Sequence, residues 1–479
     1  MLKVVTTELN VLQMETRMPF KYGIATLTKI PHLFVKLELD VDGTRVSGIA
    51  SDGLPPKWFT KNPQTLFRDD LKDMFAVIRS ACDLAMQAAP AETVFDLWEQ
   101  IYKGQSRWAG PKGYPPLLWN FGVSLAERAI IDAFCRAKKT TLALAVRNNQ
   151  LGIDLGRLRS ELAGRTPAEL LPQAPLRALH VRHTVGLADP LTNADISPAE
   201  RAGDGLPQSL EENIQAYGLT HFKIKLCGDA QKDFARLHQL ANVLSRLSPD
   251  CVYSLDGNEQ YASVYDFRKF WESLHSNSAL TELLRRCLFV EQPLHRDAAL
   301  SDETAAALNA WHARPPTIID ESDADLWSLP RALDAGYVGT SHKNCKGIFK
   351  SIANACLLEK RRRETGGRFV LSGEDLCNIG PVALLQDLAA AATLGIEHVE
   401  RNGHHYFAGL SMFPDAVQND VLAKHNDLYR RHGRGFAALS INHGRIALGS
   451  VVDAPFGVDF ELNTRQFQAL DACDFSALT

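Results

Sequence analysis

Five short apolar segments of this chain each end in a charged residue, and they follow one another at regular intervals. The intervals from Lys225 to Asp256, Glu291, Asp320 and Lys343 are 31, 35, 29 and 23 residues. A strand, a helix and two loops need about that length of chain. Parallel strands place their carboxyl ends on one edge of the sheet, so we expect these five side chains to converge there.

The three acidic members of this series predict a metal site. Asp256, Glu291 and Asp320 each close a buried strand, where an ionised carboxylate is costly unless a cation or hydrogen bonds compensate it. Three carboxylates around one point suit a hard divalent cation, most naturally Mg²⁺, with Mn²⁺ as the alternative. A helix N-cap is the common role of a single such residue. Three at successive strand ends, between lysines, favour ligands.

The lysines predict proton transfer. Lys223 and Lys225 are two residues apart on one strand and therefore face the same side. We expect a lowered pKa for a lysine beside other cations, so that Lys225 acts as a base and Lys223 binds a substrate oxygen or tunes its neighbour. Lys343 should lie across the barrel mouth from the second strand. His342 should point the other way and pack.

The order of elements predicts a barrel with a second domain. Eight strand candidates lie between about 176 and 410, most of them separated by helical stretches such as 229–247, 264–274 and 348–364. This repetition favours a (β/α)₈ barrel over an open doubly wound sheet. The expected strand candidates centre on Leu179, Phe222–Ile224, Val252–Leu255, Phe289–Val290, Ile318–Ile319, Tyr337–Val338, Phe369–Leu371 and Val399.

The flanking regions predict a capping domain. Residues 1 to about 51 are typical of a β-meander, with a hairpin turn at Asp42-Gly43. We expect a capping domain over 1–170, a barrel over 171–412 and a segment over 413–479 that returns to the cap. Within that segment, 436–441 and 445–448 should form a hairpin. The polar stretch 188–210 is either a disordered loop or a functional lid.

Composition excludes several classes of protein. A formal net charge of −4 over 479 residues gives no nucleic-acid or membrane-surface signal. The nine cysteines are scattered and form no Cys-x-x-Cys pair, which favours a reducing compartment. No uncharged apolar run approaches the length of a membrane span. We therefore expect a cytoplasmic protein with a small-molecule partner.

The motifs resemble those of the enolase superfamily, and within it the muconate lactonizing enzyme-like subgroup of the mandelate racemase/muconate lactonizing enzyme family. The resemblance covers nearly the whole chain. It rests on Lys223-Ile224-Lys225, Leu255-Asp256-Gly257-Asn258, Val290-Glu291-Gln292-Pro293-Leu294, Asp320-Glu321-Ser322 and Lys343-Asn344-Cys345-Lys346-Gly347.

This resemblance implies an α+β capping domain, completed by the C-terminal segment, on a modified (β/α)₇β barrel. It also implies Mg²⁺ on Asp256, Glu291 and Asp320, and Lys225 and Lys343 as an acid/base pair. The implied reaction removes the proton α to a carboxylate. A metal-stabilised enediolate then leads to racemisation, epimerisation, cycloisomerisation or β-elimination. We expect a homo-oligomer, with these residues as substrate-binding or supporting groups: Tyr22, Asn258, Glu321, Glu374 and Glu400.

Some positions depart from related patterns. Mandelate-racemase-like members carry Asp and His at the sixth and seventh strand ends, where this chain has Lys343 and Glu374. Glu400 or Arg401 could recognise a charged group on the substrate or form a salt bridge. His404 and His405 are expected on the surface or in a loop. The alternatives are a Schiff-base aldolase barrel, with Lys225 or Lys343 as nucleophile, and a catalytically silent metal-binding barrel.

Overall fold

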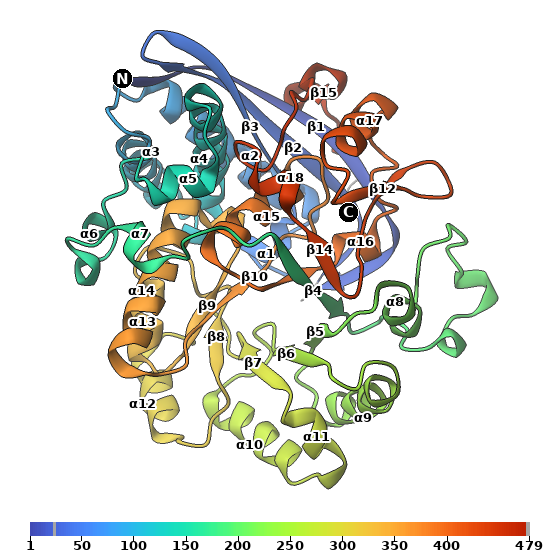
Figure 1. Cartoon of the computed structure of the whole chain (residues 1–479). Helices are drawn as coiled ribbons and strands as arrows, with labels where there is room; N and C mark the ends of the chain where they lie inside the picture. Colours follow the sequence, from blue (N-terminus) through green and yellow to red (C-terminus); the bar gives the residue numbers. More distant parts are fainter. Residues whose placement is uncertain (23–24, 476–479) are drawn as a thin grey trace.

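The computed structural model describes residues 1–22 and 25–475. The side chains of Tyr22 and Ala25 lie outside this description, so the predicted substrate contact of Tyr22 stays a prediction. Figure 1 shows an antiparallel sheet and its helices covering one end of a barrel, with the C-terminal segment returning to that sheet.

The antiparallel sheet is the expected β-meander. Its strands are β1 (Leu2–Tyr22), β2 (Ala25–Val41), β3 (Thr44–Gly53) and β15 (Gln468–Ala469), in the order β15-β1-β2-β3. The turn between β2 and β3 has positive φ at Asp42 and Gly43, as a tight hairpin requires. Because β15 comes from the last residues described, the C-terminal segment does complete the capping sheet.

Three long helices pack on this sheet: α2 (Phe67–Gln87), α3 (Val94–Ala109) and α4 (Pro116–Lys138). Helix α4 is buried along almost its whole length, as its apolar composition predicts. A Cβ atom on Gly48 of β3 would lie 2.1 Å from the Ala129 carbonyl oxygen, so only glycine permits this close packing. On its other side α4 contacts the barrel, where Asn120 donates a hydrogen bond to the Lys346 carbonyl oxygen.

The barrel has eight parallel strands and closes by pairing of the last strand with the first. Seven of the eight strand candidates overlap strands, and the sixth, centred on Tyr337–Val338, lies directly before its strand. The strands are β4 (Ala178–Val185), β5 (His221–Lys225), β6 (Val252–Asp256), β7 (Cys287–Glu291), β8 (Thr317–Ile319), β9 (Gly339–His342), β10 (Val370–Gly373) and β11 (His398–Arg401).

Helices surround the barrel, and the three predicted ones are present within one or two residues. Asp229 and Ser263 cap the first two with side-chain hydrogen bonds to backbone N–H groups. The outer helices are α8 (Leu210–Tyr217), α9 (Ala230–Leu247), α10 (Val264–His275), α12 (Asp302–Ala310), α13 (Ser328–Asp334), α14 (Ile348–Thr365) and α15 (Ala383–Leu394).

The predicted C-terminal hairpin is present only as its turn, where Asn442 and Arg445 form an antiparallel bridge, and its two strands do not pair with each other. Strand β13 (Ala437–Leu439) pairs with β12 (Tyr429–Arg431), whereas β14 (Arg445–Ala447) pairs with the barrel strand β4. The reason lies in the length of β4, because its neighbour β5 begins to pair only at Arg182. Strand β14 satisfies backbone groups on the preceding residues of β4, which would otherwise lack partners.

The stretch 188–210 is an ordered arm. It contains two short 3₁₀ turns, Asn193–Asp195 and Pro198–Glu200, each with a capping box. Arg17 of β1 donates hydrogen bonds to Asp204 and to the Pro207 and His405 carbonyl oxygens. The arm therefore connects the capping hairpin to the barrel, and these contacts disfavour the alternative of a disordered loop.

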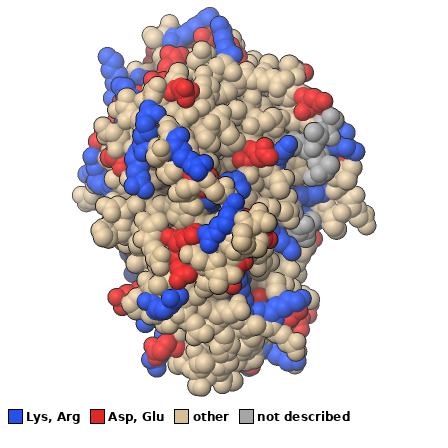
Figure 2. Space-filling model, turned by 90° about the vertical axis from the view of Figure 1, so that its right-hand side faces the viewer, with Lys and Arg blue, Asp and Glu red and all other residues tan. Residues whose placement is uncertain are grey.

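One face of the molecule carries charges of both signs, and Figure 2 shows its basic and acidic side chains interspersed. Among the described residues we find no helix that combines the length and the apolar character needed to span a bilayer.

Candidate active site

Strand register brings the predicted residues to one level of the barrel. Lys225 of β5 pairs with Asp256 of β6, which in turn pairs with Glu291 of β7. Asp320 follows the end of β8, and Lys343 follows the end of β9. All five side chains are buried. The expected convergence at the carboxyl ends of the strands is therefore present.

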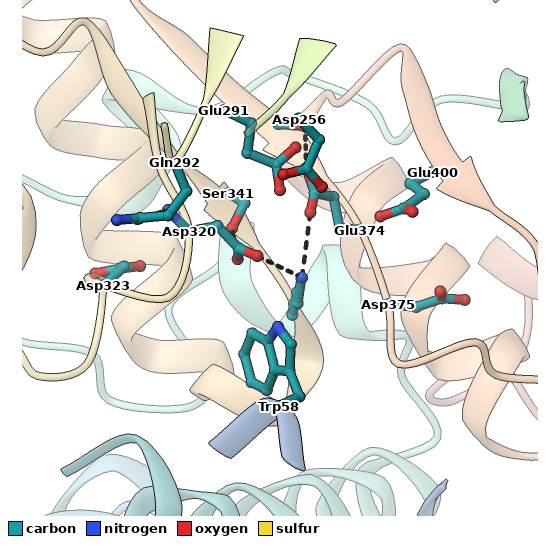
Figure 3. Close-up of polar contacts among 12 residues, drawn as sticks. Trp58, Asp256, Glu291, Gln292, Asp320, Asp323, Ser341, Glu374, Asp375 and Glu400 are labelled. Atoms are coloured by element: carbon teal, nitrogen blue, oxygen red, sulfur yellow. Dashed lines mark hydrogen bonds and ion pairs between the residues drawn. The ribbon is translucent and has the colours of Figure 1, made fainter. Parts of the chain in front are cut away.

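Three carboxylates form the candidate metal centre. Oxygen atoms of Glu291, Asp320 and Glu374 all lie within 4.8 Å of one another and are buried. Figure 3 shows these side chains pointing toward one another from the ends of β7, β8 and β10. Glu374, expected only as a supporting residue, is thus part of the group.

Asp256 contacts lysines and does not belong to this three-carboxylate group. Its Oδ2 accepts hydrogen bonds from Lys225 Nζ at 2.5 Å, and its Oδ1 accepts one from the Asn258 backbone at 2.8 Å. Lys223 Nζ lies 3.0 Å from the same Oδ2. Asp256 is thus outside the three-carboxylate group although it is adjacent to it, and its role as a metal ligand stays a prediction.

Lys223 lies among four carboxylates. Its Nζ is 2.8 to 3.0 Å from oxygens of these residues: Asp256, Glu291, Glu374 and Glu400. Burial alone would lower the pKa of Lys223, but the surrounding carboxylates, above all Asp256 and Glu291, raise it well above its ordinary value. Lys223 is therefore a fixed cation that holds the acidic side chains together.

Lys343 faces the same acids from the opposite side. Its Nζ lies 2.7 Å from Asp320 Oδ2 and 3.2 Å from Glu374 Oε2, and the ring of Trp58 covers it at 4.6 Å. Burial opposes the charge, yet Asp320 and Glu374 raise the pKa of Lys343 well above its ordinary value. The expected lowering of lysine pKa values is therefore wrong for Lys223 and Lys343 here, because carboxylates rather than cations are their nearest neighbours.

Two groups position Asp320. The side-chain oxygen of Gln292 accepts hydrogen bonds from the backbone of Asp320 at 2.8 Å and of Ser322 at 3.2 Å. Lys346 Nζ donates to Asp320 Oδ1 at 2.8 Å. Burial would raise the pKa of Asp320, but Lys343 and Lys346 outweigh it and hold that pKa well below its ordinary value. Asp320 is therefore an ionised carboxylate in a defined orientation, available as an oxygen ligand.

The group fits a divalent cation. Glu291 Oε2 is buried and has no hydrogen-bond partner among the described residues. Burial and the nearby charges of Asp256 and Glu374 raise the pKa of Glu291 well above its ordinary value. A hard cation with a preference for oxygen would satisfy the unpaired atom and offset the crowding of negative charge. These residues therefore suit Mg²⁺ or Mn²⁺ by their chemistry.

Arg182 was not recognised from the sequence as part of the site. It lies fully buried on β4, and its guanidinium donates to Ser254, Ser372 and Glu374 across the barrel interior. This leaves Glu374 Oε2 facing Lys223 and Lys343. The available signal was a single arginine within the first strand candidate, between the apolar residues Val181 and Leu179 on one side and His183 on the other.

The other predicted residues have definite partners. Glu400 lines the pocket, where it accepts hydrogen bonds from Thr184 at 2.6 Å and from Lys223 at 2.9 Å. Arg401 pairs with Asp375 at 2.5 Å. For Arg401, the structure therefore has a salt bridge, which was the alternative to recognition of a charged group on the substrate. Asn258 lines the same pocket.

Glu321 and the two histidines lie outside the pocket. Burial, followed by the charge of Asp320, raises the pKa of the Glu321 carboxyl to about 7. The surface or loop position expected for His404 and His405 is wrong for His405, which is buried, whereas His404 is half-buried. Both belong to α16 (Gly403–Tyr406), where His404 contacts His183 and the buried His405 contacts Asn213. His342 packs as expected and hydrogen-bonds Ser351.

Comparison with known proteins agrees with this architecture. The chain matches no protein-family model. Its full length resembles a mandelate racemase/muconate lactonizing protein from Herpetosiphon aurantiacus, with a TM-score of 0.60, 16% identity and coverage of 96% of this chain and 99% of that one. A dipeptide epimerase from Enterococcus faecalis V583, complexed with Mg and L-Leu-L-Tyr, gives a TM-score of 0.55 at 15% identity and covers 85% of this chain and 92% of that one.

A sequence relative supports the same grouping over a shorter stretch. An L-Lys-D/L-Arg epimerase from Methylococcus capsulatus is 36% identical over 124 residues, in a match that covers 22% of this chain and 33% of the relative. The match thus spans a third of that relative's length. The capping sheet, the eight-stranded barrel and the full-length structural neighbours agree, and the chain therefore has the fold of the enolase superfamily, in the form of its mandelate racemase/muconate lactonizing members.

Proposed function

We propose that this protein is a Mg²⁺-dependent enzyme, with Mn²⁺ as a substitute, that removes the proton α to a carboxylate of a small molecule. The observation that carries the proposal is a buried group of carboxylates flanked by Lys225 and Lys343. These lysines belong to the second and sixth strands of an eight-stranded barrel, which are diametrically opposite. A substrate between them would present one face to each lysine.

The chemistry follows from the charges at the site. A bound cation supplies positive charge to the carboxylate oxygens of the substrate, which makes the α-proton more acidic. Lys225 or Lys343 takes that proton at Nζ, and the lysine on the other side returns one. Lys223, a fixed ammonium among the acids, adds positive charge near the substrate's oxygens. The Trp58 ring over Lys343 excludes water from that side.

We favour an isomerisation as the outcome. Return of a proton to the opposite face inverts the α-carbon, giving racemisation or epimerisation. Ring closure or loss of a β-group from the same intermediate would give cycloisomerisation or elimination. The epimerase names of two relatives support inversion, and so does the placement of one lysine on each side.

The two alternatives have less support. A Schiff-base mechanism uses a lysine amine as the nucleophile and needs no metal, so it gives no role to the buried group of three carboxylates, Glu291, Asp320 and Glu374. Reductive trapping with borohydride and a carbonyl substrate would reveal that chemistry. A catalytically silent barrel would bind metal without exchanging protons. The homo-oligomer and the cytoplasmic location also remain predictions, and light scattering would test the former.

The decisive experiment follows the α-proton. The protein with Mg²⁺ is incubated with a library of carboxylates in heavy water, and α-deuterium is measured by mass spectrometry and NMR. We expect Lys225→Ala and Lys343→Ala each to lower turnover by roughly 10²–10⁴-fold. Each variant should keep exchange for only one stereoisomer of the substrate.

A matched control is Lys350→Ala. Lys350 is also buried, but it pairs with Asp323 and does not line the pocket. Its replacement should leave the stereochemistry of exchange unchanged. Full activity of both Lys225→Ala and Lys343→Ala would make these lysines structural counter-charges and would overturn the proposal.

A further inference from the structure

The pocket beside the lysines has an apolar wall. A cavity of about 50 Å³ opens next to Lys225 and Lys343, so there is little free space around the reacting groups. The cap and the loop after β10 supply its apolar side. These apolar lining residues are Phe20, Leu27, Pro55, Trp58, Leu376 and Cys377. Such a wall accommodates a compact apolar group.

An ion-pair network holds this wall in place. Arg296 donates hydrogen bonds to the Trp58 and Phe59 carbonyl oxygens at 3.0 and 2.8 Å and pairs with Glu259 at 2.9 Å. Lys61 pairs with the other oxygen of Glu259 at 2.6 Å. Trp58 is thereby fixed from the barrel side as well as from the cap, so the wall has little freedom to rearrange around a larger group.

The two acids at the far side of the pocket already have internal partners. Asp375 pairs with Arg401 and accepts hydrogen bonds from the Cys377 and Asn378 backbones at 3.0 and 3.2 Å. Glu400 is held by Thr184 and Lys223, as described above. Neither carboxylate is left to pair with a cation on a substrate.

One lining group does lack a partner. Asn402 is 4% exposed, and its Oδ1 has no hydrogen-bond partner among the described residues. It precedes α16 without capping that helix through its side chain. A buried amide without a partner is costly, and a hydrogen-bond donor on a ligand would satisfy it. The amide is uncharged, so a neutral donor satisfies its oxygen without leaving a buried charge unpaired.

We infer that the substrate is a small carboxylate with a compact, uncharged, apolar substituent and one neutral hydrogen-bond donor that pairs with Asn402. This inference rests on the proposed function, which supplies the carboxylate and the reacting α-carbon. The apolar wall binds the substituent, and the internally paired Asp375 and Glu400 exclude a cationic one. Asn402 and Trp58 are then the residues that determine specificity.

A matched set of probes tests this inference. N-acetylnorleucine and lysine acetylated at its α-nitrogen (N-acetyllysine) have the same carbon chain, but only the second carries an ammonium group. N-acetylglutamate carries a side-chain carboxylate. Calorimetry with the Mg²⁺-loaded protein measures binding, and α-deuterium incorporation measures turnover independently. We expect the norleucine compound to bind at least about tenfold more tightly than either charged compound, because burying an unpaired charge is unfavourable.

Variants of Asn402 sharpen the test. Asn402→Leu removes the acceptor and should weaken binding of N-acetylnorleucine by about tenfold or less. Asn402→Asp introduces an unpaired carboxylate and should improve binding of N-acetyllysine relative to N-acetylnorleucine. Unchanged affinity for N-acetylnorleucine in Asn402→Leu, together with unchanged relative binding of N-acetyllysine in Asn402→Asp, would overturn the role of Asn402.

The outcomes separate the two claims. Tighter binding of a charged probe, or no measurable binding of any probe, overturns the inferred substrate class. Exchange on a charged probe would still agree with the proposed function. Binding of N-acetylnorleucine in the expected order, without deuterium exchange in any probe, would support the inferred class and count against the proposed chemistry.

Discussion

Two buried polar clusters meet at the first and last strands of the barrel, and they avoid the cost of burying polar groups in opposite ways. The ionic cluster fills the barrel mouth with Arg182, Lys223, Lys225, Lys343, Lys346, Asp256, Glu291, Asp320, Glu374 and Glu400. The histidine cluster, outside the barrel wall, contains His183, His404 and His405. Arg182 and His183 are neighbours on β4 and face opposite sides.

The difference shows how burial selects the charge state. Inside the mouth burial opposes the charge of Lys223 and Lys343, but the carboxylates beside them raise the pKa of each lysine well above its ordinary value, so the charged forms are favoured. Outside the wall, burial lowers the pKa of His183 to about 3, and that imidazole stays neutral. A barrel wall one residue thick therefore separates a charged interior suited to chemistry from a neutral cluster suited to packing.

The largest expected effect comes from removing a carboxylate of the ionic cluster. Glu291→Gln should weaken Mg²⁺ binding by more than about 100-fold, because groups that only support ligands already contribute 10–100-fold. Calorimetric titration with Mg²⁺ and Mn²⁺ measures this. Glu400→Gln, in the same cluster but outside the three-carboxylate group, should weaken binding less, within the roughly 10–100-fold range of supporting groups. Equal losses in the two variants would contradict the assignment of the group.

The next effect concerns stability of the ionic cluster. Arg182→Met leaves Glu374 without one of its buried partners and should reduce the free energy of unfolding by about 3–5 kcal/mol. Urea denaturation measures it. Arg285→Met breaks an exposed pair with Glu282 and should cost less than about 1 kcal/mol. Similar losses in both would mean that burial does not distinguish these pairs.

The smallest effect is the pH response of the histidine cluster. His183 has a folded pKa of about 3, below its unfolded value near 6.5. The unfolded chain therefore binds a proton that the native state excludes, and stability falls as the pH drops from about 6.5 toward 3, by up to about 1.4 kcal/mol per pH unit.

His183→Gln should remove this contribution. Urea unfolding at pH 7, 6 and 5 should give a shallower loss of stability in the variant, and proton uptake on unfolding at pH 5 should fall by about one. An unchanged pH dependence would show that His183 is protonated in the native protein, and the contrast between the two clusters would fail.

Much of the site could be predicted because it depends on local pattern. Alternation along a strand directs Lys223 and Lys225 inward together, and parallel strands bring Asp256 and Glu291 to the same level. The eight strands and the capping meander follow from apolar runs and turn residues of the same local kind. These features depend on neighbours within one element or between consecutive strands, and the chain encodes them directly.

Other features depend on contacts across the whole fold. Glu374 joins the metal group because Arg182 reaches it across the barrel interior, and β14 pairs with β4 because that strand extends beyond β5. The burial of His405 and the unpaired oxygen of Asn402 depend equally on distant segments. The sequence by itself determined the strand-end acids and lysines through local periodicity. The tertiary structure decided their partners and charge states, because burial and electrostatic pairing depend on every element that surrounds a side chain.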